Sequence, residues 1–186
     1  MRRFVILTVV AMCVVHVAGA LPADAFQRLD NLIATQPAIV AEKEARLARL
    51  KADLARETSA AGRYSSLRRL YEEYSAYQYD SAYAYVSQCI NLAMTMGNES
   101  LLNESRLNLA HILSTACLMD KARSTLNQID TTRLTPSQLV VYHRTLTDLL
   151  IYQAEYMQGT QYAEEYVQQL IQVRVVPLTN RVANWQ

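Results

Sequence analysis

The feature that most constrains this chain is an arrangement of small and large apolar residues that recurs at nearly fixed distances. Residues 109–113 (Leu-Ala-x-x-Leu) are followed, after eight residues, by 122–129 (Ala-x3-Leu-x2-Ile). The arrangement returns at 150–154 (Leu-Ile-x-x-Ala) and, again after eight residues, at 163–170 (Ala-x3-Val-x2-Leu). Small residues at helix crossings, with larger apolar residues one turn away, are typical of stacked helical hairpins. The spacing therefore predicts an all-α solenoid.

An earlier, less regular copy starts at residues 70–74 (Leu-Tyr-x-x-Tyr). It continues either at 83–90 (Tyr-x3-Ser-x2-Ile) or, if the turn is one residue shorter, at 82–89 (Ala-x3-Val-x2-Cys). The three copies together resemble a tetratricopeptide-repeat array. The resemblance implies a right-handed superhelix of about three hairpins, preceded by an N-terminal helical segment. Such arrays bind or scaffold other proteins and are not typically catalytic.

Helix boundaries follow from the few residues that interrupt the apolar pattern. The chain has only four Gly and four Pro, and Gly62, Gly97 and Gly159 fall between periodic segments, where turns are needed. Residues 135–138 (Thr-Pro-Ser-Gln) form a good helix start, with a cap residue and Pro at the first helical position. The predicted helices span residues 24–34, 37–57, 62–77, 80–96, 98–116, 119–129, 136–157 and 160–174.

The second of these segments differs from the repeats. Val40, Leu47 and Leu54 are spaced seven residues apart with Leu50 between them, among many charged residues. Two interpretations remain open: a short coiled-coil seam, through which the chain could form a homodimer, or an N-terminal cap on the solenoid. We expect Pro37 to begin this helix and not to lie within a longer one.

The first twenty residues have the features of a signal peptide. Arg2 and Arg3 precede an apolar run, and Ala18-Gly19-Ala20 has the small-x-small form of a cleavage site. An uncleaved signal anchor is the alternative, although the run is short for a membrane span. We therefore expect 1–20 to be the signal peptide of an exported protein. The remaining regions are N-terminal helices at 21–61, repeats at 62–175 and an irregular tail at 176–186, which indicates truncation.

The charge and the reactive residues indicate a non-catalytic chain. Without Arg2 and Arg3, 16 basic residues face 17 acidic ones, so bulk charge attracts neither nucleic acid nor anionic lipid. There is no CxxC, HExxH, GxSxG or phosphate-binding Gly-rich loop, and we expect no enzyme activity, cofactor or metal. His111 and His143 lie on different predicted helices. In an exported protein Cys89 and Cys117 can pair, or they can serve as small apolar residues.

Tyrosine is unusually common, with twelve in the chain and seven between residues 64 and 85. Tyr71, Tyr74, Tyr77, Tyr79 and Tyr83 occupy both helices of the first predicted hairpin. They can form an aromatic binding surface or fill the interface between the helices. We favour the second interpretation because most of them fall on the apolar stripe.

Several segments resemble a particular group of proteins. They are residues 43–51 (Lys-Glu-Ala-Arg-Leu-x2-Leu-Lys), 70–83 (Leu-Tyr-Glu-Glu-Tyr-x2-Tyr-Gln-Tyr-Asp-Ser-Ala-Tyr), 106–110 (Arg-Leu-Asn-Leu-Ala) and 122–126 (Ala-x3-Leu). The chain is similar here to the exported N-terminal part of membrane-spanning tetratricopeptide-repeat regulators of Bacteroidota. Those proteins continue through more repeats, a transmembrane helix, a coiled coil and a C-terminal module of uncharacterised type. The resemblance implies the sensor end of a transcriptional regulator, anchored in the inner membrane through a part that this chain lacks.

Two functions follow from these observations. The first is a periplasmic sensor that binds a protein or peptide in the concave groove of the repeats, and the second is a stand-alone exported adaptor or dimerising scaffold. In a tetratricopeptide hairpin the first helix lines the groove. The residues that the repeat frame places there are Arg68, Glu72, Ser75, Glu104, His111, Ser114, Asp148, Tyr152 and Glu155. They lack the Lys/Asn/Arg pattern of repeats that clamp a peptide carboxylate, which disfavours that class of ligand.

Overall fold

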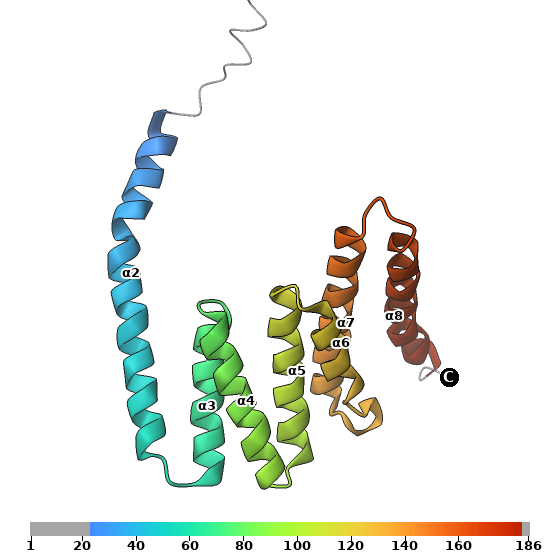
Figure 1. Ribbon diagram of the computed structural model, residues 1–186, viewed down its shortest axis with the longest axis horizontal. Helices are drawn as coiled ribbons and strands as arrows, with labels where there is room; N and C mark the ends of the chain where they lie inside the picture. Colours follow the sequence, from blue (N-terminus) through green and yellow to red (C-terminus); the bar gives the residue numbers. More distant parts are fainter. Residues whose placement is uncertain (1–22, 184–186) are drawn as a thin grey trace, which may run out of the picture. The chain divides into compact units, whose positions relative to one another are not determined.

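The computed structural model describes the backbone of residues 23–183 and the side chains of residues 24–173. The predicted signal peptide at 1–20 and the last three residues of the predicted tail lie outside these ranges. The described part contains seven α-helices, one short 3₁₀-helix and no strand (Figure 1). The elements are α2 (Ala23–Arg56), α3 (Ala60–Ser75), α4 (Tyr79–Thr95), α5 (Glu99–Thr115), α6 (Met119–Asn127), η1 (Thr131–Arg133), α7 (Pro136–Tyr156) and α8 (Ala163–Ala183).

The chain divides into two units, one up to Arg46 and one from Leu47 onward. Within the second unit, α3 packs on α4, α5 on α6, and α7 on α8. Each hairpin also packs on the next, through α4 with α5 and through α7 with both α5 and α6. Figure 1 shows these helices following one another as a row of up-and-down elements. The predicted all-α, tetratricopeptide-like solenoid is confirmed.

The core of the second unit is built from the repeat positions. Leu70, Ala110, Ala122 and Leu126 are buried, as the spacing predicts. In the first hairpin the buried small residue is Ala82, followed by Val86 and Cys89 on the same face of α4. Tyr83 is exposed, so the shorter of the two possible turns is the correct one.

The turns on either side of α5 have the same geometry but different residues. After α4, Gly97 has φ +61°, and Asn98 N donates to the Ala93 carbonyl. After α5, Cys117 has φ +59°, and Leu118 N donates to the Leu113 carbonyl. Both are helix ends of the type that needs one residue in the left-handed region, where glycine is favoured. Cys117 occupies the glycine position of the second turn.

The structure corrects two expectations about the ends of the chain. The predicted helices 24–34 and 37–57 are one helix, α2, with Pro37 inside it. Proline removes one hydrogen bond of the helix, but the neighbouring side chains of α2 are exposed, so water can reach the freed carbonyl. The tail that the sequence predicts to be irregular from residue 176 is helical as far as Ala183. Extending an existing helix costs far less than starting one, so no apolar period is needed.

None of the helices in residues 23–183 combines the length and apolar character needed to cross a membrane.

Candidate partner-binding groove

Helices α3 and α5 are joined by three side chains of α3, spaced along one face. The Tyr64 hydroxyl donates to the Leu101 carbonyl (3.1 Å) and hydrogen-bonds with Ser105 Oγ (3.0 Å). Two turns further along, the Tyr71 hydroxyl donates to the Asn108 carbonyl at 3.1 Å. Burial of the two phenols raises the pKa of both, that of Tyr64 to about 12. Both phenols therefore stay neutral, and their hydrogen bonds fix the register of α3 against α5.

Between the two tyrosines lies an ion-pair cluster. Arg68 Nη1 donates to Glu104 Oε1 of α5 at 2.7 Å, and Arg68 Nε lies 3.5 Å from Glu72 Oε1 on its own helix. The hydrogen bond that Arg68 donates to Glu104 raises the pKa of the guanidinium, which stays positively charged. The three side chains are partly exposed, so they present one cation and two carboxylates to solvent.

This cluster lines a groove of about 550 Å³ across α3, α5 and the start of α7. Its lining residues are Arg68, Glu72, Ser100, Glu104, Leu107, Asn108, Thr135, Ser137, Gln138 and Val141. The groove is rich in donors and acceptors, with Leu107 and Val141 as its apolar members. It can bind a ligand that both donates and accepts hydrogen bonds along its length.

The nine predicted groove residues divide into three sets. Arg68, Glu72 and Glu104 line the groove as expected. Ser75 and His111 are half-buried and do not line it; the Ser75 hydroxyl donates to the Glu72 carbonyl of its own helix.

The other four do not line the groove either. Asp148 lies 3.9 Å from Arg144 on its own helix, and Tyr152 and Glu155 are exposed further along α7. Ser114 is buried, so the expectation that it faces a ligand is wrong. Its hydroxyl donates to the carbonyls of Ala110 and His111, so its hydrogen bonding is satisfied within the last turns of α5.

The first turn of α7 is the part of the groove that sequence reasoning missed. Gln138 accepts a hydrogen bond from Thr135 N in the capping box, and its Nε2 donates to the Ser100 carbonyl of α5 at 2.8 Å. The same side chain thus caps the start of α7 and ties it to α5. The sequence shows the capping box. The apolar repeat spacing, however, begins only where the helices of a hairpin cross, so it does not reach this first turn of α7.

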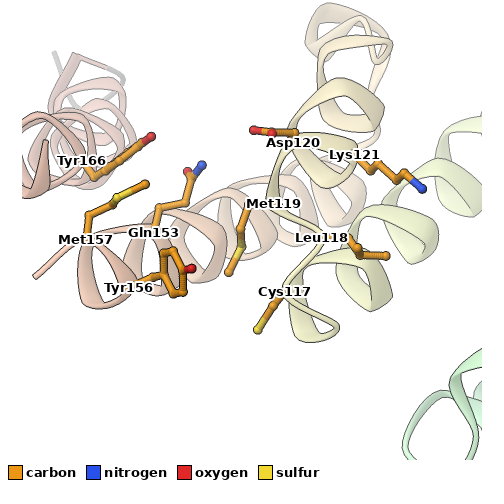
Figure 2. Close-up of a pocket in the computed structure, with 9 residues that line it drawn as sticks. All are labelled: Cys117, Leu118, Met119, Asp120, Lys121, Gln153, Tyr156, Met157 and Tyr166. Carbon is orange, nitrogen blue, oxygen red and sulfur yellow. The ribbon is translucent and has the colours of Figure 1, made fainter.

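A second hollow, of about 520 Å³, lies between the start of α6, the end of α7 and α8. Figure 2 shows Tyr166 and Met157 on one side of it and Asp120 on the other, with Gln153 between them. Its remaining lining residues are Cys117, Leu118, Met119, Lys121 and Tyr156. Arg123 Nη2 holds the Gln153 amide oxygen at 2.6 Å, so this polar group is oriented. The hollow is more apolar than the groove and is rich in methionine and tyrosine.

The two cysteines of the described part are both free thiols. Cys89 is buried in α4, and this burial raises the pKa of its thiol to about 12. Cys117 is exposed in the turn after α5. No group of three or more His, Cys, Asp or Glu side chains within the described ranges is placed to hold a metal ion.

The tyrosines of the first hairpin are mostly interior, which is the interpretation that the sequence favours. Tyr64, Tyr71 and Tyr74 are buried between helices, and the Tyr74 ring stacks on that of Tyr85 with ring centres 5.6 Å apart. Tyr77 and Tyr83 are exposed, so these two do not fill an interface.

The comparisons with known proteins agree with this architecture. No curated protein and no solved structure matches the chain. The family model described as the SusR N-terminal TPR domain matches residues 33–178, which is most of the chain. The tetratricopeptide-repeat resemblance is thereby confirmed for the repeat region, together with the protein-interaction scaffold that such repeats form. The chain belongs to the SusR N-terminal TPR domain family.

Proposed function

We propose that this chain is the periplasmic sensor region of a membrane-spanning transcriptional regulator, and that its groove binds an extended segment of a protein or peptide ligand. The observation that carries the proposal is the convergence of Arg68, Glu72 and Glu104 with the first turn of α7 on one groove. The helices that form the groove are held in register by buried tyrosine hydrogen bonds. Such a surface is already organised before a ligand arrives, which lowers the cost of binding.

The lining of the groove suits a polypeptide backbone. An extended peptide presents carbonyl acceptors and N–H donors in alternation, and the groove offers both kinds of partner in its hydroxyl, amide and charged side chains. Two carboxylates and one guanidinium give a net negative charge. The ligand segment is therefore neutral or basic, and a terminal carboxylate is disfavoured.

Site-specific photo-crosslinking in native cells tests the groove. A benzophenone amino acid replaces Asn108 in the groove and, as a matched control, the exposed Gln88 on α4. We expect a crosslinked partner of one defined mass from position 108 and none from position 88. Equal crosslinking from both positions, or none from position 108, would contradict the assignment of this groove as the binding site.

A charge exchange then tests recognition separately from folding. Arg68→Glu combined with Glu104→Arg keeps an ion pair between α3 and α5 but inverts its direction. We expect the unfolding temperature to fall only slightly, because a carboxylate at position 68 then lies beside Glu72 on the exposed face of α3, and crosslinking from position 108 to fall at least tenfold. Unchanged crosslinking in the exchanged variant would mean that these charges do not contact the ligand.

The periplasmic location has its own test, because Cys117 is exposed and Cys89 is buried. A maleimide that crosses the outer but not the inner membrane should label intact cells, and the label should disappear in Cys117→Ser. Labelling only after lysis would contradict export. An immunoblot of the native protein separates the sensor from the stand-alone adaptor. A band much larger than this chain in the inner membrane indicates a regulator, and a free periplasmic band of this size indicates an adaptor.

A further inference from the structure

The N-terminal part of α2 exposes large apolar side chains along one face. Phe26 is 60 % exposed and Leu32 is 67 % exposed, values that are unusual for such residues in a folded protein. The members of this stripe are Phe26, Leu29, Leu32, Ile33, Ile39 and Val40. Most of the stability of a helix in a protein comes from packing of its apolar face, so a partner that covers the stripe would stabilise this part of α2.

The stripe continues a heptad register that the C-terminal part of α2 already uses for packing. Phe26, Ile33 and Val40 are seven residues apart, and the same count continues through Leu47 and Leu54. Leu47 is fully buried in a cluster with residues of α3 and α4, and Leu54 packs against that cluster. At 3.6 residues per turn, the whole apolar stripe covers an arc of about 140° of the helix. Leu47, Leu50 and Leu54 thus already pack against this cluster. The part of the stripe that remains exposed lies within residues 26–40.

We propose that the exposed stripe of α2 is covered by the same stripe of a second copy of this chain, in a parallel two-helix coiled coil. The six side chains present on the order of 600 Å² per chain, and a pair therefore removes on the order of 1,200 Å², which reaches the lower end for a specific interface. A heptad seam is the pattern by which two identical helices interdigitate. Gln36 occupies one position of this seam and, as a polar residue, favours a single register.

The charges beside the stripe favour the parallel orientation. Asp30 and Glu44 lie along one edge of the stripe, and Arg28 and Arg46 lie towards the other. In a parallel pair, opposite edges of the two helices meet, so acidic residues face basic ones at similar heights. In an antiparallel pair centred on Pro37, each edge of one helix faces the same edge of the other helix. Arg28 then lies towards Arg46 of the other copy, and Asp30 lies towards its Glu44. Like charges in contact oppose that arrangement.

A membrane surface is the other occupant that an amphipathic helix can have. Helices that lie on anionic bilayers carry many Lys and Arg on the polar face. Residues 24–46 carry four acidic and three basic side chains, so this helix has no net positive charge to attract such a surface. The charge pattern therefore favours the second copy.

Disulfide crosslinking of the full chain in its native cells tests the proposal. In a Cys117→Ser background, Leu29→Cys and Val40→Cys are introduced one at a time on the stripe. Ala34→Cys and Ala41→Cys serve as matched controls on the opposite face. We expect mild oxidation to give crosslinked dimers at both 29 and 40 and none at 34 or 41. Crosslinking at neither 29 nor 40, or equally at all four positions, would overturn the proposal. A dimer from only one stripe position would overturn the parallel register, since two positions eleven residues apart cannot both self-pair in an antiparallel dimer.

A second substitution tests whether the crosslinks come from a specific dimer and not from chance encounters between chains. It also tests whether the stripe binds a membrane instead. Leu29→Glu should reduce the crosslink at Val40→Cys at least tenfold, and Ala34→Glu should leave it unchanged. The full chain should not float with vesicles of phosphatidylethanolamine and phosphatidylglycerol. Flotation that Leu29→Glu abolishes would assign the stripe to the bilayer and overturn the proposal. Failure of this dimer leaves the crosslinks from position 108 unaffected, so the groove is judged independently.

Discussion

The seam between α3 and α5 and the seam between α7 and α8 are held by different kinds of contact. Across the first, Tyr64, Tyr71 and Arg68 make hydrogen bonds between the helices, two of them to backbone carbonyls. Across the second, no hydrogen bond or ion pair joins α7 to the described side chains of α8, residues 163–173. Polar bonds need one register, whereas apolar contacts tolerate small shifts. The groove therefore has walls in a fixed register, whereas the hollow in Figure 2 lies where the described side chains of α7 and α8 meet without polar bonds.

The largest effect should come from the core of the first hairpin. Leu70 is fully buried in the cluster that joins α2, α3 and α4. Leu70→Ala should lower the free energy of unfolding by about 3–5 kcal/mol, because it loses apolar burial and leaves a cavity. Urea denaturation followed by circular dichroism measures this. A loss below about 1 kcal/mol would show that the first hairpin is no more tightly packed than the last.

Removing one hydroxyl tests the polar part of the comparison. Tyr64→Phe deletes the hydrogen bonds to Leu101 and Ser105 and should cost about 1–2 kcal/mol. Tyr166→Phe is the matched control on α8, where the structure gives the hydroxyl no hydrogen bond, and we expect almost no change. Equal losses in the two variants would contradict the distinction between the seams.

The same tyrosine predicts a pH dependence. Burial raises the pKa of Tyr64 from 10 to about 12, because the folded protein holds the phenol neutral. Its contribution to stability is fully present below pH 10 and is lost as the pH rises from 10 to 12. Unfolding midpoints measured across this interval should fall less steeply in Tyr64→Phe than in the parent. Parallel curves would indicate that the Tyr64 phenolate is tolerated in the folded state.

These contrasts show what the sequence could and could not predict. The repeat spacing located Leu70, Ala110 and Ala122 in the core, because helix crossings require small and large residues at set distances. It could not choose between Ala82 and Tyr83, since the length of a turn leaves no mark on the periodicity of the helices that it joins.

The candidate site was predictable only where it depends on the helix face. Arg68 and Glu104 line the groove, because the spacing defines the face of α3 and of α5 on which they lie. It failed for Ser114, which lies at the end of α5, where a hydroxyl bonds the helix's own carbonyls. It also missed Gln138, whose contact with Ser100 depends on how two helices meet and not on any local pattern.

A smaller effect is expected on the side of the apolar hollow. Cys117 lines this hollow and holds φ +59°, a conformation that costs a non-glycine residue about 1 kcal/mol. Cys117→Gly should raise the free energy of unfolding by about 0.5–1 kcal/mol. Gly97→Cys, in the equivalent turn with φ +61°, should lower it by a similar amount. If both changes destabilise the protein, Cys117 contributes a contact that outweighs its strain.

The smallest effect should lie on α8 itself. Val167 occupies the repeat position that corresponds to the buried Leu126 of α6, yet it is 37 % exposed. Val167→Ala should therefore change the free energy of unfolding by no more than about 0.5 kcal/mol, whereas Leu126→Ala should cost about 2–5 kcal/mol. The two variants delete apolar atoms at the same place in the repeat, so the difference between them measures how much burial each hairpin obtains from its neighbours. If Val167→Ala proves as costly as Leu126→Ala, α8 is packed as tightly as α6, and the contrast between the two seams would have to be abandoned.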